Sequence, residues 1–113
     1  GPHNLENVAV AMAIVGELGV SHEVALRALA SFRGLPHRME RVGTFDGVLF
    51  VNDSKATNTD STAPALAAFP AQGTAPRIHW IVGGLPKEDG LGACAEHLGN
   101  VAAAYTIGEA GPR

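Results

Sequence analysis

The 113-residue sequence is poor in cysteine and has no long hydrophobic segment. Its one cysteine, Cys94, cannot form a disulfide within the chain, so a reducing compartment is favoured and we expect a cytoplasmic protein. No apolar run approaches the roughly 18 residues of a membrane-spanning helix, and no secretory signal pattern is present. The formal net charge of −3 gives no overall basic field. The sequence therefore predicts neither a membrane partner nor a nucleic-acid partner.

Familiar nucleotide-binding and metal-binding patterns are missing as well. Neither the phosphate-binding pattern Gly-x-x-x-x-Gly-Lys-Ser/Thr nor the dinucleotide-binding pattern Gly-x-Gly-x-x-Gly occurs. A self-contained nucleotide-hydrolysing or dinucleotide-binding domain is therefore poorly supported. We expect no metal site in this segment, because no metal-ligand spacing joins four of its histidines, His3, His22, His79 and His97.

Residues 1–35 are predicted to form a pair of helices. Asn4 suits the N-cap of the first helix and Gly19 its C-terminal stop. Ser21 suits the N-cap of the second helix, which Gly34 would terminate. Such a pair is too short to fold alone and must pack on another part of a protein.

A domain boundary is predicted at residues 34–38, where helix signals give way to strand signals, so that residues 36–113 form a second unit. Met39–Phe45 is predicted to be a strand. Asp46-Gly47 is a strong two-residue hairpin turn, after which Val48–Asn52 pairs back along the first strand.

The rest of the second unit alternates between helix and strand patterns. Because Pro64 is tolerated only in a first turn, the next helix is expected to start between Asp60 and Ala63. This alternation predicts an α/β fold with right-handed crossovers and a parallel sheet that includes Val48–Asn52. The expected elements are a helix at 59–69, a strand at 78–82, a short helix at 91–98 and a strand at 101–107.

Polar residues follow two of the predicted parallel strands. Loops at the carboxyl ends of parallel strands, next to helix N-termini, favour anionic ligands. We therefore expect one pocket for an anion that gathers Asp53, Lys55 and Lys87, with Thr57 nearby. The alternative is a helix-capping loop with solvated lysines and a glycine turn.

Other candidate residues lie outside these loops. Asn4 and Asn7 share one helix face, and the Asn7 amide could recognise a base edge, whereas Asn4 could simply cap the helix. Cys94 and Trp80 are expected to be buried rather than reactive. A cluster of basic residues lies at the predicted boundary: Arg33, His37, Arg38 and Arg41. This cluster could bind a phosphate or carboxylate, for which arginine is well suited. Equally, it could be a surface linker whose charges are solvated.

Four motifs occur in a characteristic order: His3-Asn4-x-x-Asn7-x-x-Ala, Gly34-Leu35-Pro36-His37-Arg38-Met39-Glu40, Asn52-Asp53-Ser54-Lys55-Ala56-Thr57-Asn58 and Gly83-Gly84-Leu85-Pro86-Lys87. Together they resemble the D-glutamate-adding Mur ligases of peptidoglycan synthesis, the UDP-N-acetylmuramoyl-L-alanine:D-glutamate ligases. The most specific part is Asp53-Ser54-Lys55-Ala56-Thr57-Asn58, because sister ligases carry different residues after that Asp. Folylpolyglutamate synthase is more distantly similar.

The resemblance implies a three-domain parent enzyme. Residues 1–35 would be the last helices of its central ATPase domain, and residues 36–113 part of its Rossmann-like C-terminal domain. Both ends of the chain are then expected to be cuts through a longer protein, although Gly1-Pro2 could instead be a protease-cleavage scar. The phosphate-binding loop, the magnesium ligands and the UDP-binding domain would lie in the remainder of the parent chain. The segment alone is expected to be inactive.

The resemblance also implies a reaction. ATP with Mg²⁺ phosphorylates the carboxylate of UDP-MurNAc-L-alanine, and the amine of D-glutamate then attacks the acyl phosphate. Lys55, Arg38 and Asp53 would be the catalytic residues. The implied contacts are Asn4 and Asn7 near the adenine, Arg38 and Asp53 on the nucleotide phosphate and ribose, Lys55 and Thr57 beside D-glutamate, and Lys87 on a D-glutamate carboxylate.

The residues alone leave two other functions open. One is a non-catalytic α/β module that binds an anion or a protein. The other is a different amide ligase of the Mur and folylpolyglutamate type. Binding of D-glutamate or ADP that depends on Lys87 or Asp53 would separate the ligase from the module.

Overall fold

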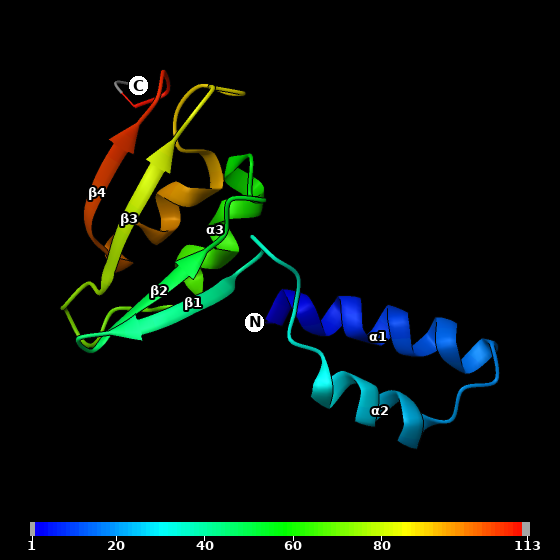
Figure 1. Ribbon diagram of the computed structural model, residues 1–113. Helices are drawn as coiled ribbons and strands as arrows, with labels where there is room; N and C mark the ends of the chain where they lie inside the picture. The colour runs from blue at the N-terminus through cyan, green and yellow to red at the C-terminus, as the bar shows by residue number, and fades with distance from the viewer. Residues whose placement is uncertain (1, 112–113) are drawn as a thin grey trace. The chain divides into compact units, whose positions relative to one another are not determined.

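The computed structural model describes residues 2–111, and the chain divides into two compact units, Gly1–Leu35 and Pro36–Arg113. Figure 1 shows the helices of the first unit and the mixed α/β elements of the second. Gly1, Pro112 and Arg113 lie outside the described residues, as do the side chains of Pro2 and His3. The expectations for Gly1-Pro2 and His3 therefore fall outside the described part.

The first unit consists of α1 (Pro2–Glu17) and α2 (His22–Ser31). The end of α1 is closed by two backbone hydrogen bonds: the N–H of Gly19 donates to the Gly16 carbonyl at 3.1 Å, and that of Val20 to the Val15 carbonyl at 3.0 Å. Gly19 has a φ of 86°, which glycine adopts without a steric penalty. The predicted stop at Gly19 is confirmed.

Of the two predicted N-caps, one caps its helix and the other does not. The Ser21 hydroxyl accepts a hydrogen bond from the Val24 N–H at 3.3 Å, as predicted for the N-cap of α2. The predicted N-cap Asn4, however, lies inside α1, which already includes Pro2. Proline is favoured in a first turn because its missing N–H is not needed there, so that prediction was wrong.

The second unit begins with an antiparallel hairpin of β1 (Glu40–Phe45) and β2 (Val48–Asn52). Asp46 and Gly47 form the two-residue turn with φ values of 50° and 78°, the backbone of a type I′ turn. The predicted hairpin is confirmed. Met39 stays outside β1 because its φ of 45° is left-handed and incompatible with a strand.

Downstream, β3 (Ile78–Gly83) and β4 (Val101–Ile107) form a parallel pair. The α/β class with a hairpin and parallel strands is therefore confirmed. The expectation that Val48–Asn52 joins the parallel sheet was wrong, because within residues 2–111 β2 pairs with β1, and β3 with β4. An alternation of elements predicts the type of crossover, but it does not specify which strand becomes the neighbour.

The helix α3 spans Thr59–Ala67 and lies where a helix at 59–69 was predicted. The Asn58 side chain accepts from the Ser61 N–H at 2.8 Å, and the Ser61 hydroxyl accepts from the Asn58 N–H at 3.3 Å. This reciprocal capping box fixes the start of the helix and leaves Pro64 in its interior. The helix predicted at 59–69 is confirmed, and the narrower expectation of a start between Asp60 and Ala63 was one residue late, because the cap outweighs the constraint that proline imposes.

The segment predicted as a short helix near residue 91 forms a 3₁₀ helix, η1 (Gly92–Asn100). In Figure 1, α3 and η1 lie beside the β3–β4 pair. Side chains alternate between half-buried and exposed along β3, as in a sheet that is covered on one face. Within residues 2–111 the buried core consists of Ala63, Leu66 and Cys94, and half-buried side chains pack against it, namely Ile78, Trp80, Ala93 and Val101.

The capping box gives a first test of this fold. Asn58→Ala is expected to lower the free energy of unfolding of the chain by about 1 kcal/mol, because the Ser61 N–H loses its side-chain acceptor. Urea unfolding followed by the fluorescence of Trp80, the one tryptophan, measures this in the second unit. Asn58→Asp keeps an acceptor and should stay within about 0.5 kcal/mol. Equal stability of Asn58→Ala and the parent would contradict the cap.

Candidate functional site

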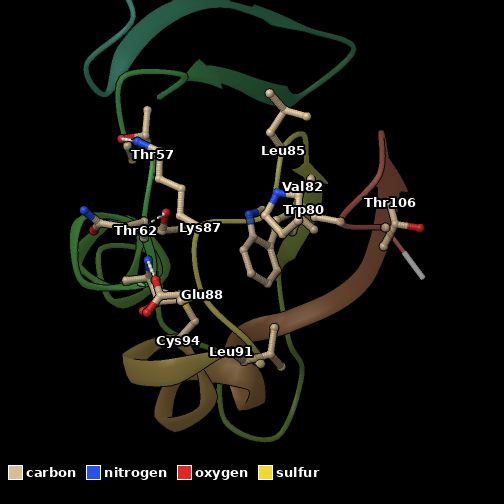
Figure 2. Close-up of a pocket in the computed structure, with 18 residues that line it drawn as sticks. Thr57, Thr62, Trp80, Val82, Leu85, Lys87, Glu88, Leu91, Cys94 and Thr106 are labelled. Atoms are coloured by element: carbon tan, nitrogen blue, oxygen red, sulfur yellow. Dashed lines mark hydrogen bonds between the residues drawn. The ribbon is translucent and has the colours of Figure 1, made fainter. Parts of the chain in front are cut away.

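A cavity of about 230 Å³ lies in the second unit, between the loop after β2, the first turn of α3 and the loop after β3 (Figure 2). The end of β4 completes its wall. The cavity joins polar groups from two loops to an apolar floor. Its principal lining residues are Thr57, Asn58, Thr59, Thr62, Lys87 and Glu88 on the polar side and Trp80, Val82, Leu85, Leu91 and Cys94 on the apolar side.

Lys87 and Thr57 meet in this cavity. The Lys87 ammonium donates a hydrogen bond to the Thr57 hydroxyl at 3.2 Å, although the two residues are far apart in sequence. Both side chains are exposed, so the remaining N–H groups of the ammonium can reach a ligand. Two of the residues predicted to bind the substrate are thus brought together, and the pairing places a cation beside the N-terminus of α3.

Glu88, which sequence reasoning left without a role, reaches the same helix terminus. Its carboxylate accepts a hydrogen bond from the Thr59 backbone N–H at 2.8 Å. This N–H, helped by the Thr59 side chain, lowers the pKa of Glu88, while slight burial opposes the shift. The carboxylate is therefore ionised at neutral pH. No local signal relates Glu88 to Thr59, because the contact spans 29 residues.

Cys94 forms part of the cavity floor and is 1% exposed. Burial raises the pKa of its thiol, and the charges of Glu88 and Asp60 raise it further. The thiol donates to the Thr59 carbonyl at 3.4 Å. Cys94 is therefore a protonated packing residue rather than a nucleophile, as predicted.

Asp53 and Lys55 do not line the cavity, although they share a loop with Thr57. The Asp53 carboxylate accepts from the Met39 N–H at 2.9 Å, and the Lys55 N–H donates to the His37 carbonyl at 2.9 Å. The prediction that Asp53, Lys55 and Lys87 form one pocket was therefore wrong. This part of the loop instead contacts the segment that precedes β1.

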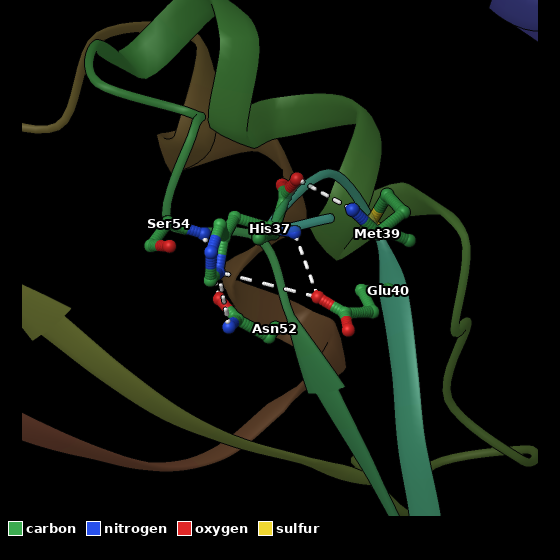
Figure 3. Close-up of polar contacts among 6 residues, drawn as sticks. His37, Met39, Glu40, Asn52 and Ser54 are labelled. Atoms are coloured by element: carbon green, nitrogen blue, oxygen red, sulfur yellow. Dashed lines mark hydrogen bonds and ion pairs between the residues drawn. The ribbon is translucent and has the colours of Figure 1, made fainter. Parts of the chain in front are cut away.

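That preceding segment is held in an unusual backbone conformation (Figure 3). His37 and Met39 have φ values of 61° and 45°, a left-handed region that non-glycine residues seldom adopt. The His37 N–H donates to the Glu40 carboxylate at 2.7 Å, and the His37 ring contacts the Asn52 amide at 2.9 Å. Arg38 lies between the two strained residues, and its side chain is exposed. The strained turn therefore presents Arg38 to solvent.

The remaining candidates, Asn4 and Asn7, lie on α1 in the first unit, where both are exposed. Among residues 2–111 no cluster of three or more histidine, cysteine or acidic side chains is arranged to hold a metal ion. None of the helices in this part of the chain has the length and apolar character to cross a membrane.

Residues 37–113, most of the chain, match the family described as Mur ligase, glutamate ligase domain. The chain belongs to the Mur ligase family. The matched segment contains the whole cavity and the strained turn around Arg38. The family resemblance predicted from the four motifs is confirmed.

Individual relatives of the chain have a more specific name. The chain is 63% identical, over its full length, to the UDP-N-acetylmuramoylalanine–D-glutamate ligase of Novosphingobium aromaticivorans. It is 54% identical over 99% of its length to the protein of the same name from Zymomonas mobilis. In both comparisons the chain spans 24% of the length of the relative.

Proposed function

We propose that this chain is part of an ATP-dependent Mur ligase that joins D-glutamate to UDP-MurNAc-L-alanine, and that its cavity forms the D-glutamate side of the active site. The observation that carries the proposal is the Lys87–Thr57 hydrogen bond inside that cavity, on a chain whose relatives are named D-glutamate ligases. Peptidoglycan synthesis in the cytoplasm is the setting that we propose for the parent enzyme.

The chemistry of the cavity suits a ligand that carries a carboxylate. The Lys87 ammonium offers N–H donors to it, while the first N–H of α3 is already taken by the Glu88 carboxylate. The Thr57 hydroxyl holds the Lys87 ammonium at the wall of the cavity. Amide formation requires the amine to be held against the acyl carbon, so orientation by fixed groups of this kind lowers the barrier.

Arg38 and Asp53 are proposed to serve the nucleotide side of the reaction, and the Lys55 side chain is proposed to lie beside D-glutamate, as the family motif implies. Asp53 and the Lys55 backbone fix the turn that carries Arg38, through the Met39 N–H and the His37 carbonyl. Arginine binds phosphate well, and ATP supplies the phosphoryl group that activates the acceptor carboxylate. Asn4 and Asn7 are proposed to lie near the adenine, with residues 1–35 as the end of the central domain. The ligands for Mg²⁺ would lie elsewhere in the parent enzyme.

A chimera tests the proposed function. The matching segment of the Novosphingobium aromaticivorans ligase is replaced by this chain, and D-glutamate-dependent phosphate release from ATP is measured with UDP-MurNAc-L-alanine present. The chimera is expected to be active with D-glutamate and inactive with L-lysine, whereas the isolated chain should stay at background. A folded chimera that prefers another amino acid would point to a different ligase of the family. Turnover by the isolated chain would contradict the need for the rest of the parent enzyme.

A further inference from the structure

Two consecutive residues of the loop after β3 reach across to the segment that begins α3. The ammonium of Lys87 contacts the Thr57 hydroxyl at 3.2 Å, and the carboxylate of Glu88 contacts the Thr59 N–H at 2.8 Å. The partners, Thr57 and Thr59, lie on either side of the N-cap residue Asn58. In one contact a cation donates the hydrogen bond, and in the other an anion accepts it. Figure 2 shows both side chains on the same side of the cavity.

We propose that Glu88 is a positioning residue that clamps the Lys87 loop to the first turn of α3 and thereby sets the place of the Lys87 ammonium. This inference rests on the proposed function, because it assigns a further residue on which the binding of D-glutamate by Lys87 depends. Glu88 is not a catalytic residue in this proposal, since its carboxylate is occupied by the Thr59 amide.

The first turn of α3 shows why an acceptor from another loop is needed. The first N–H groups of a helix have no partner within the helix. Asn58 accepts from the Ser61 N–H, which leaves the Thr59 N–H to Glu88. The charged acceptor also lies at the positive end of the helix dipole, where it is stabilised. Glu88 therefore completes the capping of α3 from a distance.

The loop that carries Lys87 has no regular secondary structure, and backbone hydrogen bonds hold its two ends, at Gly84 and Leu91. Residues 84–91 form neither helix nor strand, and Gly84 and Gly90 have φ values of 114° and 79°. A lysine on such a loop must be ordered when its ligand binds, which lowers affinity. Holding the adjacent residue to a helix N-terminus orders the loop before the ligand arrives. Loss of the clamp should therefore weaken binding more than it slows the chemistry.

A competing arrangement predicts that removing Glu88 changes the KM for D-glutamate in the opposite direction. If the Glu88 carboxylate occupied the place of a substrate carboxylate at the N-terminus of α3, the ligand would have to displace it. Removing Glu88 would then strengthen D-glutamate binding. The direction of the change in KM separates the two possibilities, since a clamp raises KM when it is lost and a competitor lowers KM.

The test uses the chimera described above, with Glu88→Ala, Glu88→Gln and the control Glu96→Ala, which removes an exposed carboxylate from η1. Glu88→Ala is expected to raise the KM for D-glutamate about tenfold and to change kcat by less than about threefold, the effect of one charge-assisted hydrogen bond. Glu88→Gln retains an oxygen that accepts from the Thr59 N–H and should recover most of the affinity. Glu96→Ala should match the parent chimera.

A double variant distinguishes positioning from general loss of structure. In a Lys87→Met background there is no ammonium left to position, so adding Glu88→Ala should raise the KM by less than about twofold. An undiminished effect in that background, an unchanged KM or a lowered KM would each overturn the proposed clamp. If the parent chimera is active, each of these results would reject the clamp but not the proposed function.

The clamp is also testable without catalysis, in the 113-residue chain itself. Hydrogen exchange of the Thr59 amide should become at least about tenfold faster in Glu88→Ala and change little in Glu88→Gln, because only alanine removes the acceptor. Unchanged exchange in Glu88→Ala would refute the clamp even if the parent chimera proved inactive. An inactive chimera with accelerated exchange would instead reject the proposed function alone.

Discussion

Lys87→Met in the active chimera is expected to lower kcat/KM for D-glutamate about 100-fold, because the substrate carboxylate loses its charged partner at a prearranged position. Lys87 is the lysine that lines the cavity, and its ammonium already has one fixed contact with Thr57. Methionine keeps an unbranched side chain, so the change removes the charge with little loss of packing. Initial rates over a range of D-glutamate concentrations measure the effect.

Two controls make the Lys87 result interpretable. Lys87→Arg retains a cation and should keep more activity than Lys87→Met, although the planar guanidinium does not reproduce the ammonium geometry. Arg77→Met removes an exposed cation that does not line the cavity and should leave kcat/KM near that of the parent chimera. A decrease of less than about threefold for Lys87→Met would place the substrate carboxylate elsewhere.

Features decided by a few adjacent residues were predictable from the sequence. Asp46 and Gly47 both tolerate positive φ, and no distant contact is needed to form their turn. Ser21 caps α2 and Gly19 closes α1 for similarly local reasons. The start of α3 was less predictable because two local signals conflict there. Asn58 favours an early start and Pro64 a later one, and their relative strengths are not apparent from residue types.

The direction of side chains within the loops could not be predicted. Asp53 and Thr57 lie in one polar segment after β2, yet Thr57 faces the cavity while Asp53 contacts Met39. The Met39 N–H that holds Asp53 belongs to a residue with a left-handed backbone, which its residue type does not predict. The Glu88–Thr59 contact likewise depends on how two distant segments pack. The sequence indicated which loops carry the site, whereas tertiary structure decides which residues meet in it.

Leu66→Ala is expected to lower the free energy of unfolding of the second unit by about 3 kcal/mol, which would be a large share of the stability of a small domain. Leu66 is 3% exposed and belongs to the core with Ala63 and Cys94. Alanine would leave a void between α3 and η1 that these elements cannot easily close. Urea unfolding monitored by Trp80, which packs against this core, reports on the second unit directly.

Matched leucine variants separate core packing from a general effect of losing a leucine. Leu85 is 78% exposed, so Leu85→Ala should change the free energy of unfolding by less than about 0.5 kcal/mol. Leu66→Met nearly conserves volume and should cost less than about 1.5 kcal/mol. Because Leu66 does not line the cavity, Leu66→Ala in a folded chimera should keep the KM for D-glutamate. A raised KM would show that the α3–η1 core also holds Thr57 and Lys87 in place. If Leu66→Ala lowers the free energy of unfolding by less than about 1 kcal/mol, this core contributes little to folding.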